Sequence, residues 1–118
     1  LQDPVEVALS FLGTPYLWGG DSSRGIDCSG LIQAACAACG LDCPGDSGAQ
    51  QAFFQKPAGP FGRGQLLFWK GHVAITINSK DLVHANAQTM TVCLESIENA
   101  IARILTLRGG PVTHHAQL

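Results

Sequence analysis

The segment Cys28-Ser29-Gly30-Leu31-Ile32-Gln33-Ala34-Ala35-Cys36-Ala37-Ala38-Cys39 is rich in alanine and favours an α-helix. Asp27 is a natural N-cap before it, and Gly40 is the expected residue just beyond its end. A cysteine therefore opens the helix, where backbone N–H groups are unpaired and the helix dipole is positive. Both features stabilise a thiolate, so we expect a lowered pKa at Cys28 and an oxyanion site at the N–H groups of the helix start. The alternative is a small buried residue with no chemical role.

Residue patterns divide the rest of the chain into a helical first half and a strand-rich second half. Capping residues, such as Asp3 before Pro4, and apolar residues at helical spacing mark the helices. Short apolar and β-branched runs between turn signals mark the strands. This order predicts an α+β fold in which three helices precede an antiparallel sheet of about five strands and the Cys28 helix packs on that sheet. The expected elements are helices over 3–13, 28–39 and 46–54, strands over 65–69, 72–77, 82–85 and 90–95, a helix over 96–103, a last strand over 104–108 and an irregular tail over 109–118, in which His114 and His115 are typical of a mobile end.

Composition excludes several classes of protein. The chain has 118 residues, enough for one domain, and its 46% apolar content with a net charge of −2 excludes disorder. The apolar stretches are too short to span a membrane, and the charge balance gives no reason to expect a nucleic acid partner. Only 14% of the residues are charged, so we expect part of the surface to be covered in a larger protein.

The five cysteines are an odd number, which argues against a complete disulfide framework and leaves a free thiol. A free thiol is typical of a reducing compartment or of a reactive nucleophile. Cys36, Cys39 and Cys43 have a spacing that could begin a zinc site, although a fourth ligand would have to come from a distance. We favour core positions for them and keep a non-catalytic zinc-binding interaction module as the alternative.

A thiolate nucleophile needs a proton carrier, and a histidine near it in space is the usual one. His72 stands at the start of an expected strand, where functional residues often lie. His84 stands inside the next apolar strand, where an imidazole needs a polar partner. If these strands pair, His84 can accept a hydrogen bond from the far ring nitrogen of His72, with Asn86 as the second choice for this role. The alternative is that His72 is a hydrogen-bonded structural residue.

Two aromatic residues, Tyr16 and Trp18, lie in the loop before Cys28. By default such residues pack against the domain, but a tyrosine hydroxyl near a nucleophile can also bind substrate. The same loop would let a substrate backbone approach closely through its glycines, Gly19, Gly20 and Gly25.

Four stretches, in this order and spacing, resemble the NlpC-type bacterial cell-wall peptidases, which are papain-like cysteine peptidases. The resemblance spans roughly residues 5 to 108. It is carried by Pro15-Tyr16-Leu17-Trp18-Gly19-Gly20, Asp27-Cys28-Ser29-Gly30-Leu31, Leu67-Phe68-Trp69-Lys70-Gly71-His72-Val73-Ala74-Ile75 and Val83-His84-Ala85.

The resemblance implies a papain-like fold and cleavage of an amide bond in peptidoglycan stem peptides or muropeptides, typically between D-γ-glutamate and a diamino acid. No metal or cofactor is implied. By position, Cys28 matches the nucleophile, His72 the base and His84 the polar third residue. The candidate substrate-binding residues are Tyr16, Asp27, Ser29 and Trp18, among which the Asp27 carboxylate suits a substrate ammonium group. Gln65 departs from the usual aspartate of a Gly-Asp-Leu turn, which we expect to affect the turn and not the chemistry.

Members of this family often carry further domains, including bacterial SH3-like ones that close one end of the cleft. The low surface charge agrees with such a domain outside this chain. An amidase or acyltransferase that uses the same cysteine and histidine is the alternative enzyme. Unpaired cysteines favour a cytoplasmic role in trimming recycled wall fragments over a periplasmic or secreted one.

Overall fold

The computed structural model describes residues 3–18, 20–22, 25–107 and 109–118. Gly19 of the glycine-containing loop and Arg108 lie outside the described residues. The elements are α1 (Pro4–Ser10), β1 (Asp21–Ser22), β2 (Gly25–Ile26), α2 (Cys28–Ala38), α3 (Ser47–Phe53), β3 (Gln65–Trp69), β4 (His72–Thr76), β5 (Asp81–Asn86), β6 (Thr91–Ser96), α4 (Ile97–Thr106) and β7 (His114–Gln117).

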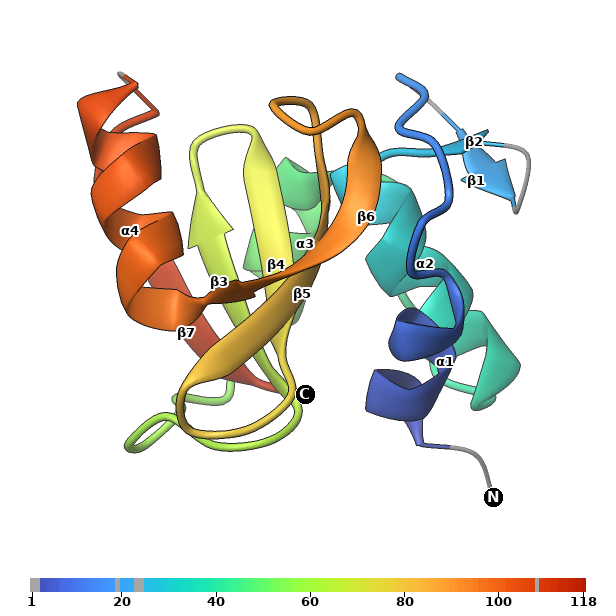
Figure 1. The fold of residues 1–118 in the computed structure, drawn as a ribbon. Helices are drawn as coiled ribbons and strands as arrows, with labels where there is room; N and C mark the ends of the chain where they lie inside the picture. The colour runs from blue at the N-terminus through green and yellow to red at the C-terminus, as the bar shows by residue number, and fades with distance from the viewer. Residues whose placement is uncertain (1–2, 19, 23–24, 108) are drawn as a thin grey trace.

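A five-stranded antiparallel sheet lies between two helical layers (Figure 1). Its strand order is β6-β5-β4-β3-β7, so neighbouring strands from β3 to β6 also follow one another in the chain. Helices α1 and α2 cover one face and share a core cluster with it, while α4 covers the other face with a second, smaller cluster. This arrangement confirms the predicted α+β fold with three helices before the sheet and the Cys28 helix packed on it.

Helix α2 begins and ends where the sequence predicted, to within one residue. The Asp27 carboxylate accepts a hydrogen bond from the Gly30 N–H at 2.6 Å, which caps the first turn and places Cys28 at the first helical position. Cys39 is the C-cap, and Gly40 follows with a φ of +70°, a value that favours glycine. The helix buries Leu31 and three further apolar residues against the sheet, namely Ile32, Ala35 and Cys36.

Strand alternation decides which side chains face each helical layer. Val73 and Ile75 of β4 belong to the core cluster under α1 and α2, whereas Ala74 belongs to the cluster under α4. Since side chains two residues apart share a face, His72 stands on the α4 side of the sheet. His84 stands on that side too, because it lies two residues from Leu82, which packs under α4.

Three predicted elements are wrong in their ends or type. Helix α1 ends at Ser10 and not at Gly13. The strand expected over 104–108 does not form over the described residues 104–107, because α4, capped by Ser96, continues to Thr106 and packs Ile104 against the sheet. The irregular tail is also wrong over His114–Gln117, which forms β7 beside β3.

Gln65, which differs from the usual aspartate of the family pattern, helps to explain why β7 forms beside β3. Its side-chain amide donates to the Pro60 carbonyl at 2.9 Å, and its side-chain oxygen lies 2.6 Å from Nε2 of His115. The residue therefore holds the turn before β3 and joins β3 to β7.

Among the described residues, every helix falls short of the length and apolar character that a membrane span requires.

Candidate active site

A cavity of about 270 Å³ opens where the start of α2, the β3–β4 turn and α4 meet. Cys28 reaches it from α2, and His72 reaches it from the first position of β4. The other lining residues come from the loops after β3 and β5, from the end of α4 and from the loop before α2, and they are Tyr16, Trp69, Lys70, Gly71, Asn86, Ala87, Gln88, Arg103, Ile104, Leu107 and Gly109. Two of the predicted catalytic residues, 44 positions apart in the chain, thus meet at one cavity.

The Cys28 side chain is 7% exposed and lies against the backbone on both sides of His72. Its thiol donates to the Gly71 carbonyl at 3.8 Å, and the backbone N–H of Val73 interacts with the sulfur. Burial raises the pKa of the Cys28 thiol, and this effect outweighs the opposing hydrogen bonds from backbone N–H groups, including those at the start of α2. The expectation of a lowered pKa is therefore wrong for the free chain, because the helix start alone does not reveal how far the thiol is buried.

The rings of His72 and His84 are joined by a hydrogen bond of 2.8 Å between Nε2 of His72 and Nδ1 of His84. The predicted pairing of β4 with β5 is present and brings the two residues together. Burial is the largest cause that lowers the pKa of His72 to about 3, with the charges of His84 and Arg103 adding to it. Burial also lowers the pKa of His84, which is fully buried. Both rings are therefore neutral at pH 7.

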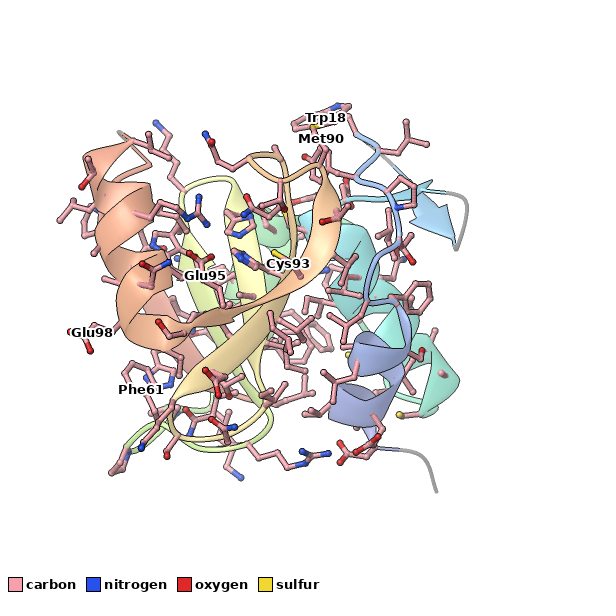
Figure 2. All side chains as sticks on the ribbon, viewed as in Figure 1. Trp18, Phe61, Met90, Cys93, Glu95 and Glu98 are labelled. Atoms are coloured by element: carbon pink, nitrogen blue, oxygen red, sulfur yellow. The ribbon has the colours of Figure 1, made fainter. Side chains whose placement is uncertain are left out.

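Sequence reasoning missed the next partner in this chain of contacts. Glu95 of β6 places Oε1 2.9 Å from Nε2 of His84. Arg103 of α4 binds both carboxylate oxygens, with Nε 2.8 Å from Oε2 and Nη2 2.7 Å from Oε1. Figure 2 shows Glu95 between α4 and the sheet. Side-chain alternation along β6 puts Glu95 on the same face as Cys93. The strand register that sets Cys93 opposite His84 cannot be predicted from the local sequence.

The predicted substrate-binding residues divide into two groups. Tyr16 lines the cavity, and burial, followed by the nearby Cys28 and Asp27 charges, raises the pKa of its hydroxyl, which stays protonated. Asp27 caps α2 and also accepts from the Ser29 hydroxyl at 3.3 Å. Ser29 is buried, and Trp18 is 85% exposed at the surface (Figure 2). Neither Ser29 nor Trp18 is among the described residues that line the cavity.

The cysteines of the zinc alternative do not form a metal site. In the part of the chain that the structure describes, no three side chains of histidine, cysteine, aspartate or glutamate are placed to hold one metal ion. Cys36 is buried in the core and its thiol hydrogen-bonds to Cys43, which raises the pKa of Cys36 and lowers that of Cys43. Cys39 is half-buried at the helix end. The described residues therefore provide no three-ligand cluster for the zinc-binding alternative.

The α+β fold, in which a cysteine at a helix start and a histidine at a strand start line one cavity, is of the papain-like class. A sequence model described as the NlpC/P60 family matches residues 13–108. This chain belongs to the NlpC/P60 family, which confirms the resemblance seen in the sequence.

Two curated relatives and one solved structure give the scale of the similarity. Dipeptidyl-peptidase 6 of Lysinibacillus sphaericus is 36% identical over 99 residues, which are 82% of this chain and 36% of that protein. The γ-D-glutamyl-L-lysine dipeptidyl-peptidase of Bacillus subtilis is 36% identical over 93 residues, 71% of this chain and 31% of that protein. The crystal structure of the NlpC/p60 domain of the peptidoglycan hydrolase SagA matches with a TM-score of 0.74 and 27% identity, over 98% of this chain and 96% of that one. The chain thus spans about a third of the length of these two curated relatives.

Proposed function

We propose that this chain is a cysteine peptidase domain that hydrolyses an amide bond in peptidoglycan stem peptides or their fragments, of the D-γ-glutamyl to diamino acid type. One observation carries the proposal. The Cys28 thiol and the His72 ring line the same cavity, and a hydrogen bond of 2.8 Å to His84 holds the ring. The relatives named dipeptidyl-peptidases and peptidoglycan hydrolase support the class of substrate.

In the proposed acylation step, the sulfur of Cys28 attacks the carbonyl carbon of the substrate amide. His72 accepts the thiol proton as the sulfur attacks, because both groups are neutral in the free chain. The carbonyl oxygen takes the negative charge beside the backbone N–H groups of Cys28 and Ser29 at the start of α2. The tetrahedral intermediate then breaks its C–N bond, and His72 returns the proton to the leaving amine. A thioester on Cys28 remains.

In the proposed second step, water attacks the thioester carbonyl and gives a proton to His72. Collapse of the intermediate breaks the C–S bond, releases the carboxylic acid product and returns the proton to the thiol. His84 orients the His72 ring through both steps and touches no reacting atom, so it is a positioning residue.

Substrate contacts of the four remaining residues belong to the same proposal. Tyr16 is the best placed of them, since its protonated hydroxyl is a hydrogen-bond donor at the cavity wall. Asp27 would hold the substrate's amino terminus in addition to capping α2. Trp18 and Ser29 would act from outside the cavity lining, and an SH3-like domain outside this chain remains a prediction.

The test uses defined muropeptides and mass analysis of the products. Cys28→Ala should lower the rate of cleavage by at least about 10³-fold, with an unchanged circular dichroism spectrum. Cys39→Ala is the matched control, because Cys39 lies at the other end of α2, and it should cleave at the normal rate. A Cys28→Ala variant that still cleaves would contradict the assignment of the nucleophile. Transfer of an acyl group in place of hydrolysis would favour the acyltransferase alternative.

A further inference from the structure

We infer that Glu95, held by Arg103, sets the proton arrangement of the two histidines and leaves Nδ1 of His72 as the nitrogen that accepts the thiol proton. This inference rests on the proposed function, since it assigns two positioning residues to that reaction. It follows from an unbroken line of contacts that runs from α4 through β6 and β5 to β4.

The line starts at a carboxylate that is fixed from several sides. The Glu95 side chain is 11% exposed, and Arg103 binds it through two N–H groups. The side-chain amide of Asn99 donates to Oε2 at 2.6 Å. The hydrogen bond from Arg103 is the largest cause that holds the pKa of Glu95 below its usual range. Glu95 is therefore ionised at neutral pH, and an ionised carboxylate can only accept hydrogen bonds.

Each contact then determines the next one. Because Glu95 accepts, Nε2 of His84 must carry a proton and donate it. A neutral imidazole has one N–H, so Nδ1 of His84 is an acceptor, and Nε2 of His72 must be the donor in the bond between the rings. The same rule leaves Nδ1 of His72 without a proton. A neutral His72 with a free Nδ1 is the form that a general base requires.

The same contacts need not rearrange when His72 becomes charged during the reaction. When Nδ1 takes the thiol proton, Nε2 keeps its proton and still donates to His84, so no bond in the line has to reverse. The negative charge of Glu95 favours a positive His72, but the opposing electrostatic effects of His84 and Arg103 on the pKa of His72 are each larger. The titratable and charged groups near the two rings include Cys28 of α2, Cys93 and Glu95 of β6, and Arg103 of α4. Tyr16 and Lys70 line the same cavity as His72.

The decisive measurement is the tautomer of each ring in the free protein. Nitrogen-15 NMR of histidine-labelled protein at pH 7 should show that Nε2 is protonated and Nδ1 is unprotonated in both His72 and His84. Glu95→Leu removes the acceptor at similar volume, so the rings should become mixtures of tautomers. The kcat for muropeptide cleavage should fall by about 100-fold with KM changed less than about twofold.

Two further variants make the test specific. Glu95→Gln keeps a neutral acceptor and should retain the tautomers with a fall in kcat of only about tenfold, which also covers the case in which Glu95→Leu does not fold. Glu98→Leu is the control, because Glu98 is an exposed acid on α4 that faces away from Glu95 (Figure 2), and it should behave as the unmodified chain.

The outcomes separate this inference from the proposed function. Unchanged tautomers in Glu95→Leu would overturn the inference whether or not the chain cleaves muropeptides. Shifted tautomers with a normal kcat would overturn it as well, since the arrangement would then have no role in the reaction. If the chain cleaves no muropeptide while the tautomers shift as expected, the proposed function fails and the proton arrangement stands.

Discussion

The side-chain amide of Gln50 donates to the backbone carbonyl of Ser29 at 3.0 Å and so joins α3 to the first turn of the helix that carries Cys28. The same nitrogen donates to the Pro44 carbonyl at 2.9 Å. Gln50 is fully buried, although it stands on a short helix with many exposed residues. The first turn of the helix that carries the proposed nucleophile is thus joined to a buried polar residue that lies outside the motifs of the sequence analysis.

Replacement of this buried amide should weaken the fold. Gln50→Leu removes both donors and leaves the two carbonyls without them, so we expect the free energy of unfolding to fall by roughly 1–3 kcal/mol. Gln55→Leu is the comparison, because Gln55 makes two similar bonds to Gln51 and Ala52 on the exposed surface, and it should cost less than about 0.5 kcal/mol. Urea denaturation measures both. Equal losses of unfolding free energy in the two variants would show that burial of the Gln50 hydrogen bonds adds nothing to stability.

Asp27 has a capping role that can be separated from a substrate role. Asp27→Ala removes the acceptor of the Gly30 N–H and should cost about 1 kcal/mol of stability. Asp27→Asn keeps the cap but removes the charge, so its thermal midpoint should be nearly unchanged. If the carboxylate binds an ammonium group, Asp27→Asn should lose its preference for substrates with a free amino terminus over blocked ones. An intact preference in this variant would restrict Asp27 to capping.

The pH profile of cleavage should lack the acid limb of an ordinary histidine. The pKa of His72 is lowered to about 3 from the usual 6.5, so the ring stays neutral and able to act as a base well below pH 6. We expect kcat/KM, which reports on groups of the free enzyme, to be level from pH 7 to pH 5 and to fall only below that range. A histidine of pKa 6.5 would instead be about 97% protonated at pH 5. A fall in kcat/KM with a midpoint near 6.5 would contradict the effect of burial on His72.

Metal removal should leave the fold intact. The described cysteines form no metal cluster, so treatment with a chelator should not shift the thermal midpoint. Cys36→Ala should lower the free energy of unfolding by about 1 kcal/mol, because it removes a sulfur from the core. Zinc bound at one ion per chain, or unfolding on chelation, would support the zinc-binding alternative.

The last strand should be part of the cooperative fold. Ala116 of β7 is fully buried in the core cluster under α1 and α2, so Ala116→Asp would bury a charge there. We expect a loss of more than about 3 kcal/mol, seen as a large fall in the thermal midpoint. Pro111→Ala, at an exposed position before the strand, is the control and should have little effect. Similar midpoints for the two variants would mean that β7 contributes no stability.

Local signals were sufficient to predict the elements that carry Cys28 and His72. An aspartate cap, an alanine-rich run and a closing glycine placed Cys28 at the start of α2, because caps and propensities act within a few residues. A Lys70-Gly71 turn followed by a run of apolar and β-branched residues placed His72 at the start of β4. The prediction of an irregular tail was wrong because the strand β7 has weak apolar character. This strand depends on pairing with β3, where Gln65 contacts His115.

The sequence by itself determined the fold class, the helix that begins at the cysteine and the two histidines that share neighbouring strands. Only the tertiary structure decided that Glu95 and Arg103 continue the line from His72 and His84, and that burial raises the pKa of the Cys28 thiol. The physical reason is that caps and turns are set by neighbours along the chain. Strand register, burial and the contacts between α4 and the sheet are set by residues that meet only when the chain is folded.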